Sequence, residues 1–184
     1  MIISICGKSG SGKSTLTNEL LEHYADNAIH IDVDKIGHYV NTIPEVLAEE
    51  VSCFGEKILT NGIVDRKKLG KIVFSDDKEM AKLTEITWKY IEKEIDRIIE
   101  VNKNKLIILD WQLTPKTKFF EQSDLTVLLD VPVEIRKSRI LKRDTITPEQ
   151  FDIREQASID YSLYKFDIIQ TEINIDEIKK KVKL

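Results

Sequence analysis

Directly after the apolar run Ile2-Ile3-Ser4-Ile5-Cys6, the chain reads Gly7-Lys8-Ser9-Gly10-Ser11-Gly12-Lys13-Ser14. This pattern is typical of a phosphate-binding loop, in which glycines let backbone N–H groups approach phosphate oxygens more closely than a Cβ would permit. The lysine of such a loop reaches the β- and γ-phosphates of a nucleoside triphosphate, and the serine after it ligates Mg²⁺. We therefore predict a strand, the loop and then a helix whose N-terminus points at the anion.

The loop supplies the first candidate functional residues. We expect the phosphates to be bound by a continuous set of residues: Lys8, Ser9, Gly10, Ser11, Gly12, Lys13, Ser14 and Thr15. Within this set, Lys13 would stabilise the transferred phosphoryl group and Ser14 would ligate the metal. The alternative interpretation is a glycine-rich turn without a ligand, because short motifs of this kind also arise by chance.

Further apolar runs indicate the remaining strands of a sheet. Four short runs rich in branched apolar residues occur at residues 28–31, 106–109, 125–129 and 167–171. Runs of this length are typical of buried parallel strands, and helical patterns of crossover length separate them. We therefore predict an α/β fold of three layers, in which a parallel sheet of about five strands has helices on both faces.

The length of the chain, 184 residues, predicts a single domain over residues 1–184, with two special regions inside it. The interval 40–104 is too long for one crossover and has a helical pattern throughout, so we interpret it as a helical acceptor-binding insertion. The irregular stretch 144–165, between the fourth and fifth strands, carries the charged and aromatic residues expected of a closing lid.

The composition argues against several classes of protein. The formal net charge of -4 disfavours non-specific binding to nucleic acid, which depends on an excess of lysine and arginine. Cys6 and Cys53 provide neither a disulfide framework nor metal-ligand spacing. No apolar run has the length of a membrane span or the charged start of a signal peptide. We expect a cytoplasmic monomer or weak homo-oligomer that takes a small-molecule acceptor and binds neither nucleic acid nor membrane.

Two carboxylates follow the second predicted strand. Asp32 and Asp34 are two residues apart, and side chains with that spacing on a strand share a face, at the carboxyl end where parallel sheets bind ligands. One of them would accept the proton of the acceptor, and the other would act through the waters of the metal. The alternative is that Asp34 caps a helix that begins at Lys35, and the two roles are compatible.

A helix that carries three arginines is expected after the fourth strand. It places Arg136, Arg139 and Arg143 at positions i, i+3 and i+7, along one side, where cations would face several phosphate oxygens. Arg143 is the better candidate for phosphate because of its planar fork, whereas Arg139 would contact the nucleotide's phosphates or stack on its base. The alternative is a solvated basic face. Arg154 is either a lid cation or an ordinary exposed arginine.

Two stretches beyond the loop resemble the dephospho-coenzyme A kinase family. The first, Asp32-Val33-Asp34-Lys35-Ile36-Gly37-His38, is similar to the family's Asp-Ala-Asp-Lys-Ile-Ala-His. The second runs from Phe54-Gly55-Glu56-Lys57-Ile58-Leu59 through Gly62-Ile63-Val64-Asp65-Arg66-Lys67-Lys68-Leu69-Gly70-Lys71-Ile72-Val73-Phe74, and general P-loop proteins do not carry it. Lys142-Arg143-Asp144, followed by Arg154, also fits the family's lid pattern. The resemblance covers most of the chain.

This resemblance implies a P-loop NTPase fold, ATP and Mg²⁺ as cofactors, and a reaction. The family transfers the γ-phosphoryl group of ATP to the 3′-hydroxyl of dephospho-coenzyme A, the last step of coenzyme A biosynthesis. By the same resemblance, Asp34 would be the general base, Asp32 its partner on the metal or substrate side, and Arg143 the lid's phosphate contact.

Several positions depart from the family pattern, and they cluster on the acceptor side. Trp88-Lys89 stands where the family has His-Pro, and Trp111-Gln112 begins the segment where the family has an apolar residue followed by Pro-Leu-Leu. The usual glutamine of the lid is displaced or replaced, with Gln156 two residues early. Larger aromatic side chains would reshape an acceptor pocket. Two alternatives therefore stay open: a nucleoside or nucleotide kinase with another acceptor, and a nucleotide-binding protein without turnover.

Overall fold

The computed structural model describes residues 1–183, which form two compact units. The first unit comprises Met1–Asp32 and the chain from Asn102 onward, and the second comprises Val33–Val101. Most of the predicted insertion, residues 40–104, lies within the second unit. No helix in the described part of the chain is both long enough and apolar enough to span a membrane.

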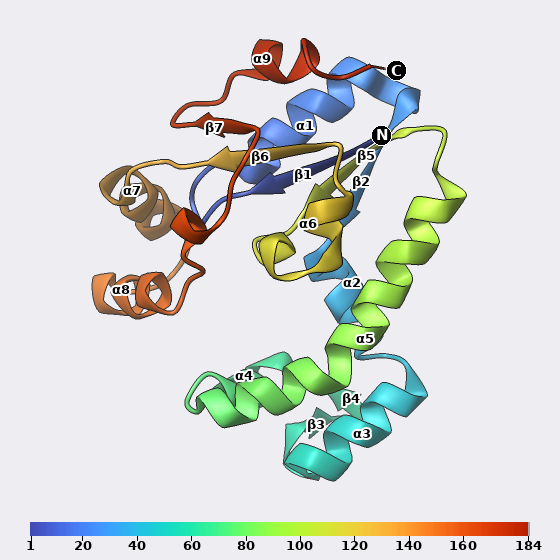
Figure 1. Ribbon diagram of the computed structural model, residues 1–184. Coiled ribbons are helices and arrows are strands. Elements are labelled where there is room, and N and C mark those ends of the chain that lie inside the picture. Colours follow the sequence, from blue (N-terminus) through green and yellow to red (C-terminus); the bar gives the residue numbers. More distant parts are fainter. Residues whose placement is uncertain (184) are drawn as a thin grey trace. The chain divides into compact units, whose positions relative to one another are not determined.

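The first unit is built on a parallel sheet of five strands (Figure 1). Across the sheet, the strands are β2 (Ala28–Asp32), β5 (Leu106–Asp110), β1 (Ile2–Cys6), β6 (Leu125–Leu129) and β7 (Ile168–Gln170). Every neighbouring pair is parallel. The five predicted strands and their parallel direction are thus confirmed, with ends that differ from the predicted ones by at most one residue.

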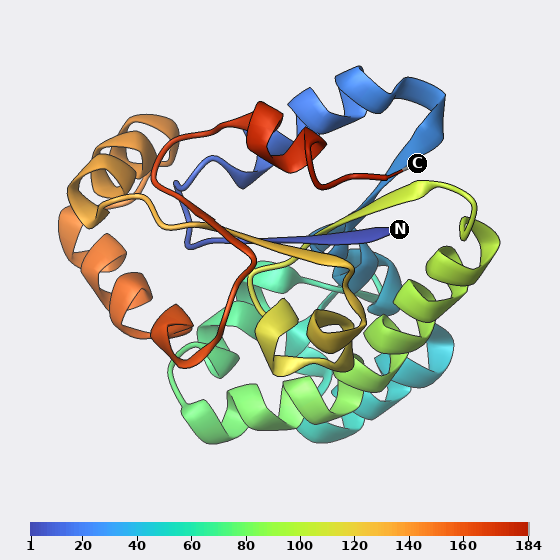
Figure 2. The same ribbon diagram turned by 45° about the horizontal axis from the view of Figure 1, so that its top comes forward.

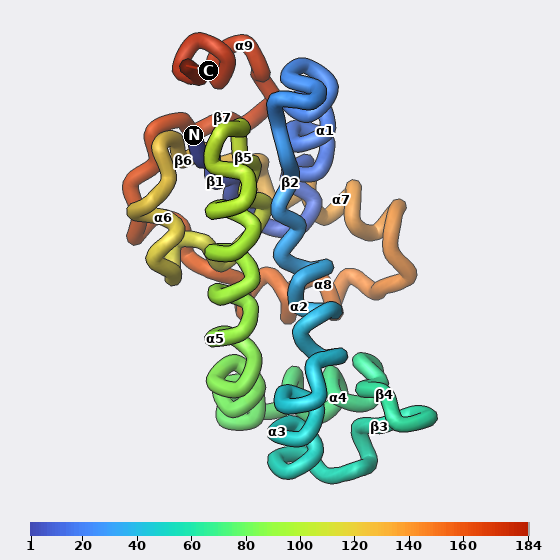
Figure 3. Tube along the Cα trace, turned by 90° about the vertical axis from the view of Figure 1, so that its right-hand side faces the viewer, coloured from blue at the N-terminus to red at the C-terminus, as the bar shows by residue number. Residues whose placement is uncertain are grey.

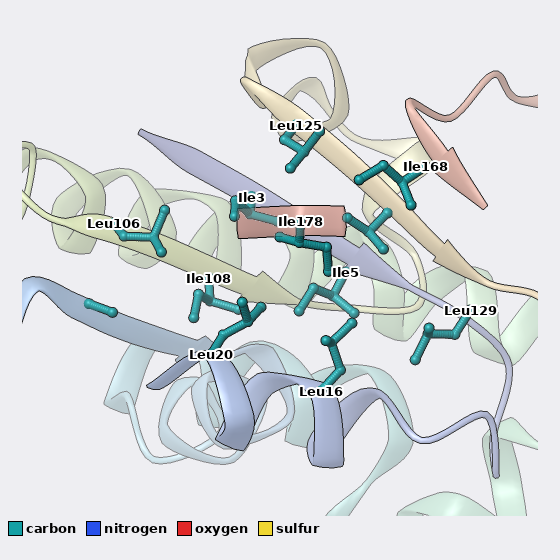
Figure 4. Close-up of a cluster of buried hydrophobic side chains, with 12 residues drawn as sticks. Ile3, Ile5, Leu16, Leu20, Leu106, Ile108, Leu125, Leu129, Ile168 and Ile178 are labelled. Carbon is teal, nitrogen blue, oxygen red and sulfur yellow. The ribbon is translucent and has the colours of Figure 1, made fainter. Parts of the chain in front are cut away.

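Helices cover both faces of this sheet, as predicted. Figures 1 and 2 show α1 (Lys13–Tyr24) and α9 (Ile175–Lys179) on one face and α6 (Lys118–Gln122) on the other. Alternate side chains of a strand point to opposite faces, so one face of β1 presents Ile3 and Ile5 to the first pair of helices. Figure 4 shows the resulting core, which also contains Leu16, Leu20, Leu106, Ile108, Leu125, Leu129, Ile168 and Ile178. Burial of each such side chain stabilises the fold by about 1.5–3 kcal/mol.

Two further helices follow β6. They are α7 (Val133–Arg143) and α8 (Pro148–Gln156), and Figures 1 and 2 show them at the end of the sheet to which the strand arrows point. The expectation of an irregular stretch over residues 144–165 is wrong for α8. This helix begins with a capping box, in which the Thr147 hydroxyl accepts from the Gln150 N–H and the Gln150 amide accepts from the Thr147 N–H.

The second unit is mainly helical (Figure 3). Its helices are α2 (Val33–Val40), α3 (Pro44–Phe54), α4 (Arg66–Val73) and α5 (Asp77–Val101). The expectation of helix throughout is wrong, because β3 (Leu59–Thr60) and β4 (Ile63–Val64) form an antiparallel hairpin. Asn61 and Gly62 between them have φ of 53° and 77°. Asn-Gly is the preferred pair for a two-residue hairpin turn of this hand, so the sequence did contain the signal.

A carboxyl group is buried in this helical unit without a hydrogen-bond partner in the described part of the chain. Glu50 lies on α3, one turn after Val46 and one turn before Phe54, and all three side chains are buried. Neither carboxyl oxygen of Glu50 has a hydrogen-bond partner among residues 1–183. Burial disfavours the charged form and raises the pKa of this carboxyl to about 7.

We expect Glu50 to make the stability of this unit depend on pH. The unfolded chain releases the proton near the ordinary pKa of 4.5, whereas the folded chain keeps it up to about 7. As the pH rises from 4.5 to about 7, the free energy of unfolding of the wild type therefore falls by about 3 kcal/mol relative to that of Glu50→Gln. Above this interval the difference between the two proteins is constant. In a Trp111→Phe background, Trp88 is the only tryptophan, so its fluorescence in urea titrations reports on this unit. Parallel pH profiles of the two proteins would contradict the prediction.

Candidate active site

The predicted phosphate-binding loop connects β1 to α1. Gly12 is the N-cap of α1 with φ of 98°, and Gly10 has φ of 79°, values that L-residues with a side chain rarely adopt. A Cβ on Gly10 would lie 2.8 Å from the carbonyl oxygen of Arg136, so the loop packs too tightly against α7 for any other residue. The glycines are thus required by both conformation and space.

The polar groups of the loop suit an anion. Lys13 Nζ donates a hydrogen bond to the Gly7 carbonyl over 3.0 Å, which places the ammonium group over the loop. The Ser11 hydroxyl is buried and has no hydrogen-bond partner in the described chain. Ser14 and Thr15 are exposed in the first turn of α1, where backbone N–H groups and the helix dipole favour negative charge. These groups fit the phosphates of a nucleotide.

Two carboxylates end adjacent strands beside this loop. Asp32 ends β2 and Asp110 ends β5, and the two are paired in register; Asp110 is also paired with Ile5, two residues before the loop. The strands are parallel, so both carboxylates lie at the ligand-binding edge of the sheet. Asp110 was missed in the sequence, although an aspartate that closes an apolar run is the same signal that identified Asp32.

The donor set at this edge also fits magnesium. No group of three or more His, Cys, Asp or Glu in residues 1–183 is arranged to hold a metal ion. Mg²⁺ in nucleotide sites is usually held by one or two protein oxygens together with phosphates and waters, so such a group is not required. Ser14 supplies a hydroxyl oxygen, and Asp32 and Asp110 supply carboxylates.

Asp34 lies in the second unit, whereas Asp32 lies in the first. The helix begins at Val33, directly after β2, so Asp34 is in the first turn of α2. The expectation that Asp34 ends a strand beside Asp32, or caps a helix that starts at Lys35, is therefore wrong. Its side chain is exposed, and its role as general base stays a prediction.

Two of the three arginines of α7, Arg136 and Arg139, bind the backbone of the loop. Arg136 is buried and donates to the carbonyls of Val131 and Ser9 and to both carboxylate oxygens of Glu155. The expectation that Arg136 shares a phosphate-binding stripe is wrong, because protein acceptors occupy its guanidinium group. Arg139 is exposed and donates to the carbonyl of Gly10 over 3.1 Å.

Arg143 lies at the end of α7, where the lid begins. Its side chain is 67% exposed and forms a two-pronged ion pair with Asp144, at 2.7 and 3.0 Å. It lines a cavity of about 130 Å³ together with Lys8, Arg154, Glu155 and Ser158, among others. The structure thus brings the two predicted lid cations, Arg143 and Arg154, to one cavity with the first residues of the loop. Their contact with phosphate stays a prediction.

Glu155 and Tyr161 were not predicted from the sequence. Glu155 on α8 binds Arg136 and, over 2.9 Å, Lys8 Nζ, and these cations lower the pKa of its carboxyl to about 2. The buried hydroxyl of Tyr161 accepts from the Gly7 N–H over 3.1 Å and donates to the Gln112 carbonyl over 2.9 Å. Both residues lie far along the chain from the loop, so no local pattern indicates the contacts.

The acceptor-side departures have contacts of their own. In the second unit, Trp88 Nε1 donates to Glu92 and Lys89 binds both carboxylate oxygens of Glu49 at 3.2 Å. In the first unit, the carbonyl of Trp111 accepts from the Thr114 hydroxyl. Trp88 and Lys89 thus make these contacts through their side chains, whereas Trp111 makes its contact through the backbone.

The fold resembles three solved structures over nearly its whole length. A crystal structure from Thermus thermophilus has a TM-score of 0.78 with 21% identity and covers 97% of this chain and 92% of its own. A dephospho-CoA kinase from Campylobacter jejuni has a TM-score of 0.56, 22% identity and coverage of 98% and 92%. A deoxyadenosine kinase from M. mycoides, solved with dATP, has a TM-score of 0.53, 17% identity and coverage of 98% of both chains. At these identities the likeness shows the fold alone.

The sequence comparisons are more specific. A family model described as dephospho-CoA kinase matches residues 1–169. A dephospho-CoA kinase from Aquifex aeolicus is 33% identical over 98% of this chain and 93% of its own. The dephospho-CoA kinase of Fusobacterium nucleatum is 32% identical over 99% of this chain and 95% of its own. The chain therefore belongs to the dephospho-CoA kinase family.

Proposed function

We propose that this protein transfers the γ-phosphoryl group of ATP to the 3′-hydroxyl of dephospho-coenzyme A. The observation that carries the proposal is the family match over residues 1–169, which includes the loop, Asp32 at the end of β2, Asp34 at the start of α2 and the lid. The loop geometry supports the donor half, because tight packing of Gly10 on α7 and the buried Ser11 hydroxyl form a cradle suited to phosphates.

Most residues of the site would act by position and charge. Lys13 and Arg143 would stabilise charge on the transferred group, and the backbone from Lys8 to Thr15 would hold the donor phosphates. Arg139, exposed and bound to the Gly10 carbonyl, would contact the nucleotide. Bound Mg²⁺ would neutralise charge on the β- and γ-phosphates, held by Ser14 and Asp32.

Asp34 would act on the acceptor. Its carboxylate would take the proton of the 3′-hydroxyl as that oxygen bonds to the γ-phosphorus and the bond to the ADP oxygen breaks. Asp32 would act on the metal side or the substrate side. We also propose that the enzyme works in the cytoplasm, as a monomer or weak homo-oligomer, on a small-molecule acceptor.

The decisive experiment is a panel of acceptors. Purified protein, ATP and Mg²⁺ are incubated with dephospho-coenzyme A, or with nucleosides and nucleotides at the same concentration, and ADP is measured. We expect release of ADP with dephospho-coenzyme A well above that with every other acceptor. The panel includes other acceptors because the chain departs from the family pattern on the acceptor side, at Trp88, Lys89, Trp111 and Gln112. A different acceptor is therefore the main alternative outcome.

The result also separates the alternatives. Background release of ADP at millimolar dephospho-coenzyme A would overturn the proposal. Turnover of a nucleoside instead would keep the phosphotransferase and change its acceptor. Binding of ATP without transfer to any acceptor would leave a nucleotide-binding protein without turnover.

A further inference from the structure

Three charged side chains from distant parts of the first unit form one network beside the phosphate-binding loop. Glu155 on α8 binds Arg136 on α7 through two bonds of 2.8 Å, and it binds Lys8 of the loop at 2.9 Å. The exposed fractions of the three side chains are 22% for Glu155, 6% for Arg136 and 27% for Lys8. The network is therefore largely shielded from solvent, where such pairs are screened least.

The same network reaches the backbone of the loop. Arg136 Nη1 lies 3.5 Å from the Ser9 carbonyl, and Arg139 Nη1 binds the Gly10 carbonyl at 3.1 Å. These bonds draw the carbonyl oxygens of the loop toward α7. In each peptide unit, the N–H points away from its carbonyl, so cations that bind these carbonyls favour loop N–H groups directed away from α7.

We propose that Glu155 is a positioning residue for the nucleotide, which sets the shape of the loop through Lys8 and Arg136 and thereby couples loop and lid. Glu155 holds the Lys8 side chain and fixes the Arg136 guanidinium in the orientation that reaches Ser9. Because Glu155 itself belongs to α8, movement of this helix changes the loop. This inference rests on the proposed use of ATP.

A purely electrostatic effect of these charges on ATP predicts that one variant, Glu155→Gln, binds ATP more tightly, the opposite of what a positioning role predicts. If the charges acted only through their potential at the phosphates, Lys8→Met would weaken ATP binding and Glu155→Gln would strengthen it. The double variant would then return to the affinity of the wild type. A positioning role predicts that both single variants and the double variant weaken ATP binding by a similar factor, because each breaks the contact between Lys8 and Glu155.

The test is calorimetric titration of the full-length variants with ATP and Mg²⁺, without acceptor. We expect Lys8→Met, Glu155→Gln and the double variant each to raise the Kd by about tenfold. Steady-state kinetics should show the same increase in the KM for ATP, with the KM for the acceptor unchanged. Glu155→Gln removes the charged partner of the buried Arg136 and could therefore unfold the protein. Lys8→Met leaves the pair between Arg136 and Glu155 intact, so it tests the inference even if Glu155→Gln does not fold.

Asp152→Asn is the matched control. Asp152 lies on the same helix α8 and pairs with Lys137 of α7 on the surface, at 2.6 Å, so its loss tests a lid ion pair that does not touch the loop. We expect its Kd for ATP to equal that of the wild type. Unchanged Kd values for ATP in Lys8→Met and Glu155→Gln, with lowered melting temperatures, would mean that the network only stabilises the fold, and this would overturn the inference. Tighter binding by Glu155→Gln would establish the purely electrostatic effect instead. A wild type that does not bind ATP would overturn the proposed function rather than this inference.

Discussion

Replacement of Lys13 with alanine is expected to lower kcat/KM for ATP by roughly a thousandfold. The Lys13 ammonium group lies over the loop, held by the Gly7 carbonyl at 3.0 Å, where the donor phosphates would bind. Removal of this charge leaves the developing negative charge on the transferred group without its nearest cation. The measurement is ADP release over a range of ATP concentrations with saturating acceptor.

The control for this prediction is Lys181→Ala, which removes an exposed lysine after α9. It should leave kcat/KM unchanged. The melting temperature of Lys13→Ala should stay near that of the wild type, because the lysine anchors no part of the described hydrophobic core. A loss of less than tenfold would show that the loop does not deliver this lysine to the phosphates.

Asp34→Asn is expected to lower kcat by about a hundredfold to ten-thousandfold, while the Kd for ATP changes by less than about twofold. An amide of the same size cannot accept the proton of the acceptor hydroxyl, but it leaves the donor loop in place. Rapid-quench measurement of phosphoryl transfer, combined with calorimetric titration of ATP, separates the two quantities.

Asp77→Asn provides the matched comparison. Like Asp34, Asp77 is an exposed aspartate in the first turn of a helix, so its replacement removes the same favourable interaction with a helix dipole. It should keep full activity. Loss of ATP binding in Asp34→Asn, in proportion to the loss of rate, would mean that the carboxylate serves the donor side.

Several elements were predictable because single residues or short patterns determine them. The five strands follow from apolar runs, and the loop follows from glycines at positions such as Gly10 and Gly12, which have positive φ. The turn at Asn61-Gly62 and the capping box at Thr147 were equally local signals. The first was missed in an interval interpreted as helical, and the second in an interval interpreted as irregular.

Other features depend on where elements begin and how they pack. The sequence placed Asp34 on the same strand face as Asp32, whereas the structure starts α2 at Val33 and puts Asp34 in a helical turn. The spacing of Arg136 and Arg139 predicted a common side correctly. It could not show that this side meets the carbonyls of the loop, because the acceptors lie more than a hundred residues away in the chain.

The sequence by itself determined the parallel sheet, the phosphate-binding loop and the family of this protein, because backbone conformation and side-chain periodicity are properties of neighbouring residues. Only the tertiary structure decided that Glu155 joins Lys8 to Arg136, that Tyr161 caps the Gly7 N–H and that Asp110 stands beside Asp32. Long polar side chains can reach many partners, and the packing of α7 and α8 around the loop selects which of these are within hydrogen-bond distance.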